Sequence, residues 1–258
     1  MRPVLLHVGA LAVPTHDTLV LLGVLAAALV FRHEARRLGA WGDERVLWIV
    51  VGTLAGGAVG AKLATVWRYV AATGDASVAG MLVRGGRSIL GGLAGAYVGA
   101  VLTKRVVGYR RRTGDLFAPA VALGMAVGRV GCLLTEPPGT PTMLPWGMRL
   151  TPGEAAAIAG CPAWCVGPAL HPSFAYEILF HLAAFAALWW WLRPRPHVEG
   201  DLFKQYLLAY AVFRFGVEFV RGNDVVWHGL TRSQLFLIPS GALLAAYFAR
   251  RRALPATA

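Results

Sequence analysis

The stretch LFAPAVALGMAVGRVGCLL, residues 116–134, decides the fold class of this chain. A helix needs ~20 mostly apolar residues to cross a bilayer, and this stretch reaches that length with Arg129 as its one charge. Similar apolar runs recur along the 258 residues, of which 57% are hydrophobic and 15% are charged. Soluble domains are usually about 25% charged. The sequence therefore predicts an all-α, polytopic membrane protein of about seven transmembrane helices.

The predicted spans cover residues 18–31, 46–67, 88–102, 116–134, 172–192, 202–220 and 233–248. Fifteen basic residues lie on one side of these spans, against seven on the other. The richer side carries Arg32, Arg36, Arg37, Arg45, Lys104, Arg105, Arg110, Arg111, Arg112, Arg193, Arg195, Lys204, Arg250, Arg251 and Arg252. Because the basic side is normally cytoplasmic, we expect the N-terminus outside and the C-terminus in the cytoplasm. A net charge of +12 spread over these loops does not form the single basic and aromatic face of a nucleic-acid-binding protein.

Residues 1–258 are expected to form a single integral membrane domain with a structured outer loop at about 135–170. Long structured loops are often functional. Cys161 and Cys165 lie in this loop, where oxidising conditions favour a disulfide, although two free thiols are the alternative. No histidine cluster accompanies them, so the sequence predicts no metal site and no cofactor.

Glycine recurs at every fourth residue in two predicted spans, a spacing that lets helix backbones approach closely in lipid. The repeats are Gly52, Gly56 and Gly60 in one span and Gly91, Gly95 and Gly99 in the other. The pairs Gly85-Gly86 and Gly91-Gly92 also flank the mouth of that span, beside Arg84 and Arg87. There we predict a backbone bend that lines a cavity, since irregular backbone at membrane depth occurs beside cavities.

Charged side chains inside the spans predict function, because each costs ~+2.5 to +3.5 kcal/mol on insertion. Arg214 and Glu218 stand four residues apart and can pair on one helical face, which is a structural interpretation. Arg129 has no evident mate, so it predicts an anionic ligand. A planar guanidinium suits phosphate oxygens, and the abundant membrane anion with a phosphate is a phospholipid.

Four motifs in order resemble the prolipoprotein diacylglyceryl transferase family over about residues 45–250. They are GRVG at 128–131, LPWG at 144–147, HPSFAYE at 171–177 and FRFGVEFVR at 213–221. The segment GGRSILGG, residues 85–92, falls where that family has a glycine-flanked histidine, and Leu90 occupies the histidine position. Cys132 and Thr135 stand in place of two family asparagines, and the tyrosine expected near the first span is not evident around Thr18.

The resemblance implies transfer of a diacylglyceryl group from phosphatidylglycerol to the lipobox cysteine of a prolipoprotein signal peptide in the bacterial cytoplasmic membrane. The thiol attacks the glycerol carbon, glycerol phosphate departs and a thioether remains. Arg129 and Arg214 are the expected catalytic residues, and no base is assignable. The expected substrate-binding residues are Arg87, Gly91, Gly92, Gly131, Glu136, Gly139, His171, Ser173, Tyr176, Glu218 and Arg221. The alternative is a catalytically altered or inactive homologue that binds an anionic phospholipid.

Overall fold

The structure, a computed structural model, describes residues 1–9, 11–84, 86, 88–158, 160–161 and 163–253. It divides into two compact units, residues 1–34 with 112–258 and residues 35–111. The helix α1 (Thr15–Arg37) begins in the first unit and ends in the second. Arg87, which the sequence predicts to bind substrate, lies outside the described residues.

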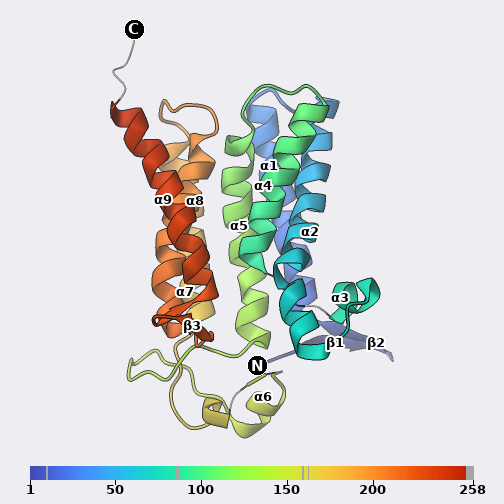
Figure 1. The fold of residues 1–258 in the computed structure, drawn as a ribbon, viewed down its shortest axis with the longest axis vertical. Coiled ribbons are helices and arrows are strands. Elements are labelled where there is room, and N and C mark those ends of the chain that lie inside the picture. Colours follow the sequence, from blue (N-terminus) through green and yellow to red (C-terminus); the bar gives the residue numbers. More distant parts are fainter. Residues whose placement is uncertain (10, 85, 87, 159, 162, 254–258) are drawn as a thin grey trace. The chain divides into compact units, whose positions relative to one another are not determined.

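The first unit contains a helical bundle with its long loop at one end (Figure 1). Besides most of α1, its long helices are α5 (Gly114–Thr135), α7 (Ser173–Ala186), α8 (Asp201–Val217) and α9 (Arg232–Ala253). The helix α7 continues as one π-helical stretch, Ala187–Leu192, and α8 continues as a 3-10 turn, Glu218–Val220. The long loop contains the short helix α6 (Pro152–Ala156) and a 3-10 turn, Ala163–Cys165.

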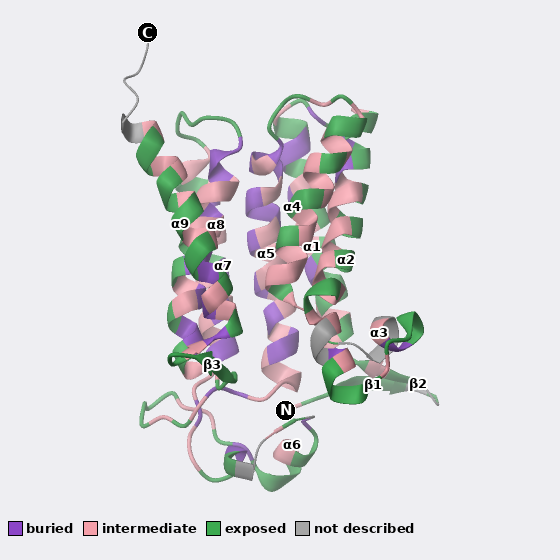
Figure 2. Cartoon of the chain, in the orientation of Figure 1, coloured by how far each residue is buried: buried purple, intermediate pink, exposed green. Residues whose placement is uncertain are grey.

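Helix α5 is the core element of the first unit, and Figure 2 shows buried residues along its length. Half of the residues in the most apolar stretch of α5 are buried, whereas at most 22% are buried in the corresponding stretch of any other helix that is long and apolar enough to cross a membrane. Small side chains explain this position, because Ala118 and Ala122 let Leu188, Leu202 and Tyr206 pack closely against α5. The buried carboxylate of Asp115 also accepts hydrogen bonds from the backbone of Gly200 (2.8 Å) and Leu202 (3.1 Å). It thereby fixes the N-terminus of α8 beside the start of α5.

The second unit consists of α2 (Glu44–Thr73), α3 (Val78–Arg84) and α4 (Ile89–Val106). The predicted glycine repeats bring the backbones of α2 and α4 together. A β-carbon on Gly56 would lie 2.4 Å from the carbonyl oxygen of Gly95, and one on Gly99 would lie 2.1 Å from that of Gly52. The prediction of close helix packing is therefore confirmed.

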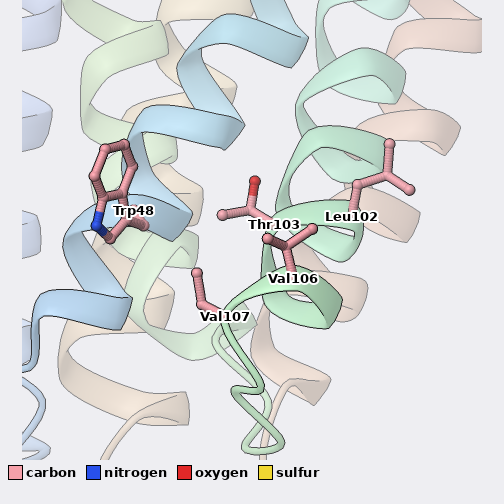
Figure 3. A pocket seen from close by; sticks show the side chains of 5 residues that line it. All are labelled: Trp48, Leu102, Thr103, Val106 and Val107. Atoms are coloured by element: carbon pink, nitrogen blue, oxygen red, sulfur yellow. The ribbon is translucent and has the colours of Figure 1, made fainter.

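Figure 3 shows a pocket on the helix pair of the second unit, lined by Trp48, Leu102, Thr103, Val106 and Val107. These lining residues include no charged side chain, so the pocket offers apolar surface rather than ligands for a phosphate.

Within the described part of the chain, five helices are long and apolar enough to cross a membrane, at Thr15–Arg37, Glu44–Val66, Ile89–Val106, Gly114–Thr135 and Ser173–Leu192. The chain is thus a mostly helical, multi-pass membrane protein. The two remaining predicted spans are also helical, as α8 and α9. With 17 residues α8 reaches about 26 Å, somewhat less than the ~30 Å hydrocarbon core.

Three local expectations can be compared with the structure. The all-α expectation overlooked two hairpins, β1 (Val4–Val8) with β2 (Leu11–Pro14) and β3 (Val225–Trp227) with β4 (Leu230–Thr231). Positive φ angles at His228 and Gly229 close the second hairpin, as a two-residue turn requires. The predicted bend does not occur at Gly91 and Gly92, because both residues lie inside α4 and face α2, whereas Gly85 of the other pair lies outside the described residues. The predicted disulfide is confirmed, since Cys161 and Cys165 are bonded.

Candidate active site

Three charged side chains from separate elements form a buried ion-pair network near the loop end of the first unit. Glu177, on α7, contacts Arg129 of α5 through Oε2 and Arg221 through Oε1, each at 2.5 Å. The carboxylate is fully buried, and the two arginine side chains are 3% and 13% exposed. The expectation that Arg129 lacks a mate is therefore wrong. Its partner lies on another helix, where sequence spacing gives no signal.

In this network two guanidinium groups share one fully buried carboxylate, and the other carboxylate near Arg221, that of Glu136, is 40% exposed and 3.9 Å away. The ring of Phe174 lies 4.2 Å from Arg221 Cζ and 5.8 Å from Arg129 Cζ, within cation–π range. Among the residues that the structure describes, the buried Nε of Arg129 has no hydrogen-bond acceptor. Buried donors are normally satisfied, so this N–H suits an anionic ligand. Burial lowers the pKa of Arg221 and Glu177 opposes that effect, and an arginine stays charged in proteins.

Arg214 and Glu218 form the ion pair that their spacing predicted. The other oxygen of Glu218 accepts hydrogen bonds from Asn223 Nδ2 at 2.7 Å and from Thr231 Oγ1 at 2.8 Å. These contacts connect the end of α8 to the strand β4. They favour the structural interpretation of the pair, and a role for Arg214 toward a ligand stays a prediction.

Backbone hydrogen bonds connect the HPS motif to the segment that carries Arg221. Gly139 N donates to His171 O (2.8 Å), His171 N donates to Thr140 O (2.9 Å), and Thr140 N donates to Val220 O (2.9 Å). A glycine is required in this ladder, since a β-carbon on Gly139 would lie 2.0 Å from Val220 O. The ladder therefore holds the start of α7 at a fixed position beside Arg221.

We expect Gly139→Ala to lower the free energy of unfolding by about 1–3 kcal/mol, because the backbone of Val220 must move away from the added methyl group. Thermal unfolding of the purified protein in detergent measures the effect. Gly153→Ala is the matched control in the same loop, since nothing lies within 4 Å of its β-carbon position. Equal melting temperatures for the two variants would contradict the ladder's role.

The side chains of the HPS motif contribute to the same positioning. His171 Nδ1 lies 3.1 Å from Tyr176 Oη, and that hydroxyl also accepts a hydrogen bond from Trp146 Nε1 at 3.0 Å. The motifs HPSFAYE and LPWG therefore meet at Tyr176. The Ser173 side chain is fully buried, and its Oγ has no hydrogen-bond partner among the described residues. These contacts favour a positioning role for His171.

A second cluster, which sequence reasoning missed, lies beside Arg129 and consists of His16, Cys132 and Glu136. His16 Nε2 lies 3.7 Å from Cys132 Sγ and 3.7 Å from a carboxylate oxygen of Glu136. Arg129 Nη1 lies 3.8 Å from the same sulfur. The close approach of α1 depends on Gly131, whose β-carbon would lie 3.2 Å from His16 O. The sequence offers one indication of this cluster, because the polar residues His16 and Asp17 directly precede the first apolar run.

Glu136 links the two clusters, since its second oxygen lies 3.9 Å from Arg221. The structure thus brings together, at one end of the first unit, Arg129, Gly131, Glu136, Gly139, His171, Ser173, Tyr176 and Arg221. Arg214, at the end of α8, pairs with Glu218 in the 3-10 turn that follows. Gly91 and Gly92 belong to the second unit, where both face α2, and their expected part in binding is not tested by these contacts.

The chain matches the family model described as prolipoprotein diacylglyceryl transferase over residues 3–250. This range extends the resemblance seen in the sequence motifs to the N-terminal segment that carries His16.

Three relatives named phosphatidylglycerol–prolipoprotein diacylglyceryl transferase illustrate the similarity. The protein of Chromohalobacter salexigens is 32% identical, over 92% of this chain and 87% of its own length. That of Azotobacter vinelandii is 32% identical, over 97% and 96%. That of Bordetella parapertussis is 30% identical, over 96% and 95%.

Proposed function

Because the chain belongs to the prolipoprotein diacylglyceryl transferase family, we propose that it transfers a diacylglyceryl group from phosphatidylglycerol to the lipobox cysteine thiol of prolipoproteins. The observation that carries the proposal is the buried network in which Arg129 and Arg221 share Glu177. Its two neighbouring guanidinium groups, and the Arg129 Nε–H that has no acceptor among the described residues, suit the phosphate of an anionic lipid. The function of the relatives and the chemistry of the site agree on one class of substrate.

The proposed reaction forms a bond between the thiol sulfur and a glycerol carbon and breaks the bond from that carbon to a phosphate oxygen. Negative charge grows on the departing glycerol phosphate. Preorganised guanidinium groups in a dry site stabilise such charge without reorganising during the reaction. We assign this role to Arg129 and Arg221, with Arg214 as a further candidate. Gly131, Glu136, Gly139, Ser173, Tyr176, Glu218 and the second-unit glycines Gly91 and Gly92 remain candidates for substrate binding.

The attacking thiol must lose its proton, because the thiolate is the nucleophile. His16 is our candidate for the proton acceptor. Its side chain is 31% exposed and contacts Glu136, whereas the His181 side chain is fully buried against Tyr206. A partly exposed imidazole beside the arginine network can reach a thiol that enters with the signal peptide.

For His16→Gln we expect turnover to fall by about 100-fold, because a neutral amide cannot accept the proton of the attacking thiol. The charged or titratable groups facing the ring are Asp17, Cys132 and Glu136. Turnover of the folded variant with phosphatidylglycerol provides the test, and unchanged turnover in His16→Gln would exclude this role.

The most direct test of the whole proposal is complementation of a bacterial strain depleted of its own diacylglyceryl transferase. We expect the chain to restore growth and to convert a fluorescent lipobox peptide to its thioether with phosphatidylglycerol as donor. Failure of both assays by well-folded protein would favour a phospholipid-binding homologue without this activity.

We further propose a single domain in the bacterial cytoplasmic membrane that contains both units, with seven spans, the N-terminus outside and the C-terminus inside. The family model runs through both units, which supports one domain. Within the first unit, the N-terminus, the loop before α7 and the β3–β4 hairpin lie at one end, and the α7–α8 connection lies at the other (Figure 1).

Reporter tags should confirm this topology. We expect tags at Arg110 and at the C-terminus to report a cytoplasmic position, and a tag at Gly153 to report the outside, because the loops with most basic residues stay in the cytoplasm. A cytoplasmic signal at Gly153 would contradict the assignment of the spans.

A further inference from the structure

We propose that His16, Cys132 and Glu136 form a binding site for one thiophilic divalent cation of the Zn²⁺ class. Their donor atoms all lie within 4.8 Å of one another. The imidazole comes from the first turn of α1, and the thiol and the carboxylate come from the end of α5. The other two cysteines are joined in a disulfide, so Cys132 is the free thiol of this chain.

The spacing of the donors fits such an ion. Around tetrahedral zinc, bond lengths of about 2.0–2.3 Å place neighbouring nitrogen, sulfur and oxygen ligands about 3.4–3.6 Å apart. The observed distances from His16 Nε2 to Cys132 Sγ and to Glu136 Oε1 are both 3.7 Å. Cys132 Sγ and the Glu136 oxygen lie within 4.8 Å of each other, so these two side chains must move closer together for all three groups to bind one ion. The Glu136 side chain is 40% exposed, so water reaches this carboxylate and is available as a fourth ligand.

The surroundings of the cluster also resemble those of a metal site. His16 Nδ1 lies 3.2 Å from Asp17 Oδ1, and a carboxylate on the outer ring nitrogen typically directs the other nitrogen toward a metal. Arg129 Nη1 lies 3.8 Å from Cys132 Sγ. The positive charges of Arg129 and Arg221 oppose a bound cation, so we expect reversible binding.

The consequence for activity rests on the proposed function. A cation on His16 Nε2 would occupy the lone pair assigned to proton removal and would lie beside the phosphate-binding arginines. Zn²⁺ should therefore inhibit transfer, whereas Mg²⁺ at the same concentration should not, because magnesium selects oxygen ligands.

Cobalt provides a readout that does not depend on catalysis. Purified full-length protein in detergent is titrated anaerobically with Co²⁺, and thiolate-to-cobalt absorption in the near ultraviolet is recorded. We expect one Co²⁺ per chain, displacement by Zn²⁺ and complete loss of the band in Cys132→Ser. We also expect at least tenfold weaker binding in His16→Gln and in Glu136→Gln.

Two matched variants make the assignment specific. The double variant Cys161→Ser/Cys165→Ser should keep the band, and so should His228→Gln, which alters an imidazole in the β3–β4 turn. Circular dichroism establishes that each variant is folded. Absence of the band in the unsubstituted protein, or its persistence in Cys132→Ser, would overturn the site. A protein that binds Co²⁺ through Cys132 but transfers no lipid would support the site and refute the proposed function.

Discussion

Replacing Arg129 with alanine is expected to lower transferase turnover by about 100- to 1,000-fold and to leave the folded yield close to normal. The loss falls on the charge that develops on the leaving phosphate. The fold tolerates the change because Glu177 keeps its contact with Arg221 and does not become an unpaired buried charge. Turnover with phosphatidylglycerol, measured beside the yield of monodisperse protein, separates the two effects.

Two further substitutions sharpen this result. Arg129→Lys keeps the charge but loses the planar, two-pronged geometry, so turnover should still be impaired. Arg214→Ala is expected to behave differently, because it leaves Glu218 buried without its ion pair and should lower folded yield. Adding Glu218→Gln should partly restore that yield. Normal turnover in Arg129→Ala would refute the phosphate-binding role of this arginine.

Glu177→Gln is expected to destabilise the protein by about 3–5 kcal/mol, the usual cost of breaking a buried ion pair from one side. Glu177 is the carboxylate that two buried arginines share, and the neutral amide would leave two positive charges close together at low dielectric. The midpoint of denaturant or thermal unfolding in detergent measures the loss.

Glu136→Gln is the matched control, with the same chemical change at a carboxylate that is 40% exposed and 3.9 Å from Arg221. Exposed pairs contribute about 0–1 kcal/mol, so this variant should unfold near the unsubstituted protein. Similar destabilisation by the two variants would mean that burial does not determine the importance of Glu177.

Local sequence patterns predicted the features that depend on neighbouring residues in one helix or loop. The apolar run 116–134 became α5, because length and hydrophobicity alone determine such a helix in lipid. The spacing of four residues predicted the Arg214–Glu218 pair, and the loop position of two cysteines predicted their disulfide. The hairpin β3–β4 was missed because three-residue strands carry almost no periodic signal.

The active-site arrangement was less predictable, since it depends on which helices become neighbours. In the sequence, Glu177 stands out only as the last residue of the motif HPSFAYE. Its contact with Arg129 could not be predicted, because that contact requires α7 to pack on α5. His16 was not predicted because it precedes the first predicted span, where the family resemblance implies a tyrosine. The small side chain of Gly131, which admits α1, explains why this histidine reaches Cys132.

The contact between α2 and α4 has a consequence for the gene. Every single-base change in a glycine codon that alters the amino acid introduces a β-carbon. At Gly56, Gly60, Gly95 and Gly99, that atom would lie only 2.1–2.4 Å from a backbone oxygen of the opposite helix. Missense mutations at these codons should therefore be purged, while outward-facing codons such as those of Leu54 and Leu63, whose side chains are 61% and 64% exposed, drift among apolar residues. We therefore expect the glycines between α2 and α4 to change less over generations than the exposed residues of the same two helices.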